Sequence, residues 1–147
     1  MFLTRIEGWP EKLMAEVELA RTIPFMWGLH DCCIFVADCV YAITGEDLAH
    51  NWRDRYYDEA SMQIFLASQD LTDLTSVADA LAAENQLEQV DPRQGRRGDI
   101  YQFDTLLGPT LGVLVDSRIV TTAPQGTKFI HLEDIIYKPN TRTWKVG

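Results

Sequence analysis

The stretch Trp27-Gly-Leu-His-Asp-Cys-Cys-Ile-Phe-Val-Ala-Asp-Cys-Val-Tyr-Ala-Ile-Thr-Gly45 decides how the rest of the chain is organised. Gly28 favours a bend, Asp31 is a residue type that caps helix N-termini, and apolar residues recur at helical spacing over residues 32–43. Gly45 is typical of the position that follows a helix. The pattern therefore predicts a helix that begins at Cys32.

The first turn of this predicted helix carries a thiol. There the side chain of Cys32 faces unpaired backbone N–H groups and the positive end of the helix dipole, both of which stabilise a thiolate. This makes Cys32 the candidate nucleophile of the chain. The alternative is that Cys32, Cys33 and Cys39 are small buried apolar residues, which is the usual role of free cysteines.

Composition limits the classes of protein to consider. The 147 residues, 46% of them hydrophobic and 24% charged, suffice for a single domain over residues 1–147 with its own core. No apolar run approaches the ~20 residues that cross a bilayer, and no signal sequence opens the chain, so we expect a protein made in the cytoplasm that inserts into no membrane. Three cysteines, two of them adjacent, do not suggest a disulfide framework. A net charge of −9 argues against sequence-independent binding to nucleic acid or to anionic lipid.

The first half of the chain, about residues 1–90, reads as helical. An amphipathic helix is predicted over residues 9–22, and Pro24 follows it as a stop signal. Two more helices are predicted over residues 58–68 and 71–85, the second capped by Asp73 or Thr75. A charged and aromatic connector separates them from the cysteine helix.

The second half, about residues 97–147, reads as strands that follow a turn-rich segment. Alternating or β-branched runs predict strands over residues 100–103, 110–115, 118–122 and 128–132, with a final edge strand over 143–146. Helices followed by hairpin-connected strands predict an α+β fold, in which N-terminal helices, including the cysteine-bearing one, pack on a C-terminal antiparallel sheet.

Three motifs, in order, resemble those of a known family. Asp31-Cys32-Cys33-Ile34-Phe35 after Trp27-Gly28 is similar to the Asp-Cys-Ser-Gly-Phe signature of the NlpC-type cell-wall peptidases, whose core is papain-like. Arg97-Gly98-Asp99-Ile100 resembles the strand start Gly-Asp-Leu of that family, and Leu111-Gly112-Val113 followed by Asp116 resembles its His-Val-Gly-Ile strand and turn. The match spans about residues 25–126. Phe25-Met26-Trp27-Gly28 and the Leu-Gly-Val strand are also similar to an NlpC-like branch of tailed phages and prophages, encoded among tail-tip genes.

The resemblance implies a papain-like, NlpC-type fold and a place in a phage tail. It implies a tail-tip or baseplate component located in the virion tail, with other tail-tip or baseplate proteins and peptidoglycan as partners. By position, the cysteine nucleophile of the family falls on Cys32, its histidine base on Thr110 and its third, orienting residue on Thr122. Because threonine cannot take a proton from a thiol near neutral pH, the resemblance also implies that the relay activating the nucleophile is missing.

Three histidines are available as substitute bases. His30 stands two residues before Cys32, where a chain entering a helix usually points away from the first-turn side chain. His131 lies on a predicted strand with an alternating pattern, typical of a structural histidine, and His50 lies in the charged connector. The sequence alone does not choose among them.

A metal site is an alternative for this stretch, because His30, Asp31 and three cysteines fall within ten residues. Structural zinc sites usually combine a closely spaced cysteine pair with a second distant pair, which this chain lacks. Cys32 and Cys39 are about two helical turns apart, too far to share one ion without other ligands. We therefore expect neither a metal nor a cofactor.

Two functions from different classes follow. The preferred one is a structural or docking protein of a phage tail tip that keeps a degenerate peptidase fold; the other is an active cysteine peptidase or amidase that cleaves peptidoglycan stem peptides. A toxin or immunity-type domain of the same fold is a third possibility. For the docking function, we expect four aromatic residues of interface-prone types to mark the contact surface: Trp52, Tyr56, Tyr57 and Trp144. Packing in the core is the competing role for these residues, and it is the preferred role for Trp144.

Overall fold

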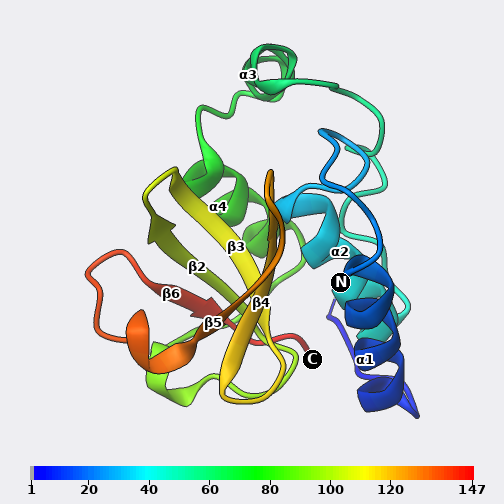
Figure 1. Ribbon diagram of the computed structural model, residues 1–147, viewed down its shortest axis with the longest axis vertical. Coiled ribbons are helices and arrows are strands. Elements are labelled where there is room, and N and C mark those ends of the chain that lie inside the picture. Colours follow the sequence, from blue (N-terminus) through cyan, green and yellow to red (C-terminus); the bar gives the residue numbers. More distant parts are fainter. Residues whose placement is uncertain (1) are drawn as a thin grey trace.

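A computed structural model describes residues 2–147 of the chain, with helices first and a sheet second (Figure 1). The helices are α1 (Trp9–Ala20), α2 (Cys32–Thr44), α3 (Glu59–Ser68) and α4 (Leu74–Glu84). The strands are β1 (Gln89–Val90), β2 (Ile100–Thr105), β3 (Gly108–Leu114), β4 (Arg118–Ala123), β5 (Gly126–His131) and β6 (Arg142–Trp144). Short 3₁₀ turns occupy Pro92–Gln94 and Leu132–Asp134. The α+β prediction is confirmed.

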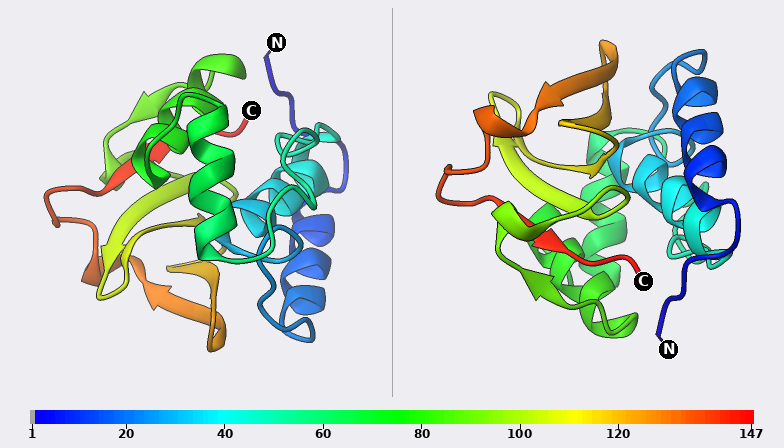
Figure 2. Two further views of the ribbon diagram at one scale, coloured as in Figure 1. Left: turned by 90° about the horizontal axis from the view of Figure 1, so that it is seen from above. Right: turned by 90° about the horizontal axis from the view of Figure 1, so that it is seen from below.

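Helix α2 begins and ends where the sequence predicts. The side chain of Asp31 accepts a hydrogen bond from the Ile34 amide at 2.9 Å, which satisfies one of the free N–H groups of the first turn. Gly45, with φ of +79°, ends the helix in the left-handed conformation. Nine of the thirteen residues of α2 are buried, because α1 covers one side of the helix and the sheet covers the other (Figure 2).

The other helix ends differ from prediction by up to three residues. Asp73, and not Thr75, caps α4, and the helix begins at Leu74 because Asp73 and Ser76 form a capping box. An equivalent pair, Asp58 and Ser61, opens α3. Helix α1 ends at Ala20, two residues before the predicted Thr22.

All six strands pair antiparallel in the order β1-β6-β2-β3-β4-β5. The prediction of a final edge strand over residues 143–146 is wrong, because β6 lies inside the sheet, between β1 and β2. The edge strand next to β6 is β1. The sequence does not predict β1, because a strand of two residues is too short to show an alternating pattern. β2 and β3 form the longest pairing, with Ile100 opposite Val113 and Phe103 opposite Thr110.

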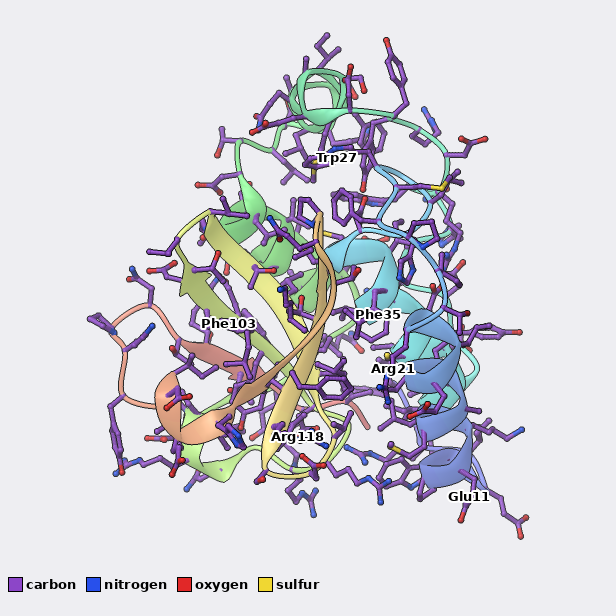
Figure 3. The ribbon with its side chains drawn as sticks, in the orientation of Figure 1. Glu11, Arg21, Trp27, Phe35, Phe103 and Arg118 are labelled. Atoms are coloured by element: carbon purple, nitrogen blue, oxygen red, sulfur yellow. The ribbon has the colours of Figure 1, made fainter. Side chains whose placement is uncertain are left out.

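The two faces of the sheet bury different clusters. The face toward α1, α2 and α4 forms the main core, with Phe35 of α2 inside it (Figure 3). The opposite face carries Phe103 in a smaller cluster that the segment around Ile135 covers. Two aromatic residues predicted for a docking surface belong to the interior instead: Tyr56 is 2% exposed, and Trp52 packs against the main core with its ring edge-on to Phe65. Trp144 is buried, as the preferred role for it required.

Arg5 ties the two ends of the chain to the start of β2. Its guanidinium donates to the Val146 carbonyl at 2.8 Å, to the Arg97 carbonyl at 2.6 Å and to Asp99 Oδ1 at 3.0 Å. Asp99 is buried and also accepts from the amides of Arg96 and Val146. The Gly-Asp motif before β2 therefore has a structural role, since its carboxylate anchors both terminal segments.

Candidate functional site

An open cleft of about 560 Å³ lies where the N-terminus of α2 meets the ends of the β2–β3 and β4–β5 hairpins, with α3 on the opposite side. Figure 1 shows α3 above the upper ends of the strands, the elements whose residues line this cleft. The lining is mostly apolar, with a few threonines, the first cysteines of α2, two acidic side chains and one lysine. These residues include Phe25, Trp27, Asp31, Cys32, Cys33, Glu59, Met62, Leu106, Leu107, Pro109, Thr110, Thr121, Thr122, Lys128 and Ile130.

Cys32 opens α2 at this cleft and is the partly exposed cysteine of the three. The thiol of Cys33, together with the Leu111 backbone amide and the Thr110 hydroxyl, lowers the pKa of the Cys32 thiol below its ordinary value. These groups outweigh burial and the Asp31 carboxylate, which act in the opposite direction. The cleft therefore favours an anion at the Cys32 sulfur.

The other two cysteines are buried and less acidic. The Cys32 side chain and burial raise the pKa of Cys33 well above its ordinary value, and burial does the same for Cys39. A protonated, buried thiol is a poor nucleophile. Cys33 and Cys39 are thus buried residues of the core, and Cys32 is the cysteine that lines the cleft with partial exposure and a lowered pKa.

Thr110 and Thr122 both line the cleft with Cys32, but they are not neighbours of each other. The hydroxyl closest to Thr110 belongs to Thr121, at 3.5 Å between the two Oγ1 atoms, and the Thr121 hydroxyl donates to the Leu111 carbonyl at 2.6 Å. Thr122 points to the other face of β4, and its buried hydroxyl has no hydrogen-bond partner in residues 2–147. Neighbouring residues of a strand point to opposite faces, so only one of Thr121 and Thr122 can meet Thr110, and no local pattern indicates which one.

All three histidines lie outside the residues that line the cleft. His30 is buried against the ring of Phe35, and burial lowers its pKa below the ordinary value. His131 is exposed at the end of β5, opposite Arg118, and His50 is exposed beside the carbonyl of Asp47. In the described part of the chain, no imidazole is placed to take a proton from Cys32.

A buried carboxylate holds the loop that precedes α2. Asp31 Oδ2 accepts from the Tyr56 hydroxyl at 2.6 Å and from the Gly28 amide at 2.9 Å, while Oδ1 accepts from the Ile34 amide. Gly28 has φ of +79°, and a Cβ atom there would collide with the carbonyl oxygen of Tyr56. Sequence reasoning missed this role of Tyr56, since one aromatic residue in an irregular connector carries no sign of its partner.

Metal ligation and membrane spanning are two further possibilities for the residues that the structure describes. Within residues 2–147, no three side chains of His, Cys, Asp or Glu converge as ligands would. Across the same residues, no helix combines the length and apolar character needed to cross a bilayer.

The walls of the cleft suit an extended, partly apolar ligand. Phe25 and Trp27 stack edge to face at 5.2 Å between ring centroids, and Figure 3 places Trp27 beneath α3. Leu106 and Leu107, at the tip of the β2–β3 hairpin, are both highly exposed and line the opposite rim. Chemically, the site offers apolar contact area and a thiol whose pKa is lowered, and among residues 2–147 no imidazole lines it.

Comparison with known proteins gives a family but no relative. A search of curated proteins finds no match to this chain. The family model described as "Domain of unknown function (DUF6950)" matches residues 4–146, a range that contains every helix and strand described above and the whole cleft. The chain therefore belongs to the DUF6950 family.

Proposed function

We propose that this chain is a peptide-docking component of a phage tail tip or baseplate, built on a degenerate NlpC-type, papain-like fold that no longer hydrolyses its ligand. One observation carries the proposal. Thr110, which matches the histidine position of the resembled peptidases, lines the cleft together with Cys32, and its hydroxyl is one of the groups that lower the pKa of the Cys32 thiol.

The chemistry of that replacement explains the loss of hydrolysis. Peptide cleavage by a thiol needs a group that removes the thiol proton and then delivers a proton to the leaving amine. A threonine hydroxyl stabilises a thiolate by donating a hydrogen bond, but it can neither accept the proton nor return it near neutral pH. Cys32 therefore ionises more readily than an ordinary cysteine while the rest of the reaction lacks a proton carrier.

The surroundings of the cleft support docking. Apolar and aromatic side chains are typical of the centres of protein interfaces. Leu106 and Leu107, in the lining of this cleft, are both exposed, and Met62 of α3 lines the other side. The proposed docking surface therefore centres on the hairpin tip, which the sequence did not suggest, whereas Tyr57 is exposed but lies outside the cleft lining.

A second candidate function, an active cysteine peptidase or amidase acting on peptidoglycan stem peptides, is favoured by one observation. Cys32 is partly exposed at the start of a helix, in a cleft that lowers its pKa. These are the conditions that activate catalytic cysteines in general. For this function a group other than the three histidines described above must supply the proton transfer.

Purified protein incubated with defined muropeptides, followed by mass spectrometry, separates the two functions. We expect no cleavage by the natural chain, and the same result for Cys32→Ala. Cleavage that disappears in Cys32→Ala would refute the docking proposal in favour of the peptidase. The assignment to the tail is tested separately, by searching for this chain in purified tails of particles induced from the host that encodes it; tails without it would overturn that part.

A further inference from the structure

A second pocket, of about 280 Å³, lies at the other end of the molecule and shares no residue with the cleft. Figure 3 shows Trp27 of the cleft near one end and Glu11, two residues after Trp9, near the opposite end. We call this second site the arginine pocket, and its lining consists of Arg5, Trp9, Arg96, Arg97 and Gly147.

Arg5 is the fixed cation of the arginine pocket. Its guanidinium makes one hydrogen bond through each of its three nitrogens, to the carbonyls of Val146 and Arg97 and to the carboxylate of Asp99. The same group lies 4.2 Å from the centroid of the Trp9 ring. Because a guanidinium has five N–H groups, two of them remain for a ligand.

A tight turn fixes the backbone of the other two arginines. The Asp99 amide donates to the Arg96 carbonyl at 2.9 Å, and Gly98, the third residue of the turn, has φ of +93°, as is typical of a type II turn. The Arg96 amide donates to Asp99 Oδ2 at 2.8 Å, and the Gly98 amide donates to the Leu114 carbonyl at 2.7 Å. The side chains of Arg96 and Arg97 therefore start from ordered backbone, and a ligand has to order only the side chains.

The positive charge of the pocket is only partly neutralised within the chain. Asp99 is buried and pairs with Arg5. Arg96 and Arg97 are exposed, and neither forms an ion pair within residues 2–147, including with the main chain at Gly147. Burial lowers the pKa of Arg5, Asp99 raises it, and the charge of Arg96 lowers it again, so the two guanidinium groups repel each other. An anionic ligand would relieve this repulsion.

The donors suit a phosphate group better than a carboxylate. One guanidinium fork already fills both oxygens of a carboxylate, whereas a phosphomonoester offers three terminal oxygens and nearly two negative charges near neutral pH. Three guanidinium groups therefore match a phosphate. The volume of the pocket leaves room for an organic part, and Trp9 offers apolar contact to it.

Acidic side chains beside the pocket disfavour a polyanion. Glu7 and Glu11, two residues to either side of Trp9, are exposed. A nucleic acid or a strongly acidic protein segment would bring further negative charges towards them, whereas a single phosphate on a small molecule does not.

From the convergence of Arg5, Arg96 and Arg97 beside Trp9, we infer that the arginine pocket binds the phosphate group of a small organic phosphomonoester. The three guanidinium groups donate to the phosphate oxygens, and Trp9 contacts the organic part. The inference goes beyond the proposed docking function and does not depend on it, because the two sites have no residue in common.

Isothermal titration calorimetry on the full chain tests the inference with phenyl phosphate, inorganic phosphate and benzoate. Ionic strength is held constant, at about pH 7.5, where phosphomonoesters are mostly dianions. The variants are Arg96→Gln, Arg97→Gln and, as the matched control, Arg93→Gln. Arg93 is exposed, belongs to the same segment and pairs with Asp91 outside the pocket lining. Arg5 stays unchanged because it holds both ends of the chain.

We expect phenyl phosphate to bind the natural chain and Arg93→Gln at least about tenfold more tightly than benzoate, and more tightly than inorganic phosphate. Arg96→Gln and Arg97→Gln should each weaken binding of phenyl phosphate by about tenfold or more, since each removes charge-assisted hydrogen bonds. Circular dichroism checks that all variants are folded.

Four results would overturn the inference. They are no binding of either phosphate, equal binding of benzoate and phenyl phosphate, equal binding of inorganic and phenyl phosphate, and a loss in Arg93→Gln as large as in the two pocket variants. The third would assign the pocket to free phosphate and refute the contact of an organic part with Trp9. Each of these results leaves the docking proposal intact, because that proposal concerns the cleft.

Discussion

Replacing Tyr56 by phenylalanine removes one buried hydroxyl and leaves the ring. The ring is buried and packs 5.8 Å from that of Phe65 between centroids, contacts that phenylalanine preserves. The hydroxyl donates to Asp31 Oδ2 at 2.6 Å, a short distance typical of a hydrogen bond to a charged acceptor. The substitution therefore isolates the hydrogen bond that links the connector to the start of α2.

The expected loss of stability follows from what remains at Asp31. A hydrogen bond to a charged group contributes about 1.5–3 kcal/mol. Because Asp31 Oδ2 keeps the Gly28 amide as a donor, we expect the free energy of unfolding to fall by about 2 kcal/mol, within that range. For a chain of this size, this corresponds to a decrease in Tm of about 4–8 °C.

Urea unfolding monitored by circular dichroism measures the change. The transition midpoint of Tyr56→Phe should decrease while the slope of the free energy against urea stays constant, because the surface exposed on unfolding is unchanged. Tyr57→Phe is the matched control, since Tyr57 is 79% exposed and its hydroxyl should matter by less than about 0.5 kcal/mol. Equal effects of the two substitutions would refute the reasoning that Asp31 depends on the Tyr56 hydroxyl.

Three further predictions concern the thiol and its loop. The alkylation rate of Cys32 should reach half its maximum below pH ~8.5, because the thiolate is the reactive form and the pKa of this thiol is lowered. A midpoint at or above that pH would contradict the hydrogen bonds to the Cys32 sulfur that lower its pKa. Thr110→His should speed alkylation of Cys32 at pH 7 by placing an imidazole at the sulfur, and Thr110→Val should slow it by removing a donor; identical rates would show that residue 110 does not contact the sulfur. Gly28→Ala should lower the free energy of unfolding in urea by more than about 2 kcal/mol, since the left-handed φ is combined with a collision between the new Cβ atom and Tyr56. Gly45→Ala is the control, because Gly45 has the same φ in open space, and it should lower this free energy by only about 1 kcal/mol. Equal losses in the two variants would exclude the collision.

Short-range patterns account for the predictions that the structure confirms. A helix cap depends on a side chain and an amide three residues apart, so Asp31 and Gly45 were sufficient to place α2. Hairpin strands depend on local alternation and on the turns between them, which located β2 to β5 within a few residues. The α+β class follows from the order of these elements alone.

The errors lie where distant segments meet. The position of β6 in the interior of the sheet depends on its pairing with both β1 and β2. The three residues of β6 do not indicate by their own sequence that they pair on both sides. Assigning Tyr56 to the surface failed for a similar reason, because the Asp31 carboxylate that binds its hydroxyl is 25 residues away in sequence.

By itself, the sequence determined the helix that begins at Cys32 and the strands that follow, since each of these is a property of neighbouring residues. Only the tertiary structure decided that Thr110 and Thr121 line one cleft with Cys32, with 3.5 Å between the two threonine hydroxyls, and that the histidines lie outside the lining of this cleft. The physical reason is that these arrangements depend on how α2 packs on the ends of β3 and β4, and that packing is fixed by burial of the whole core.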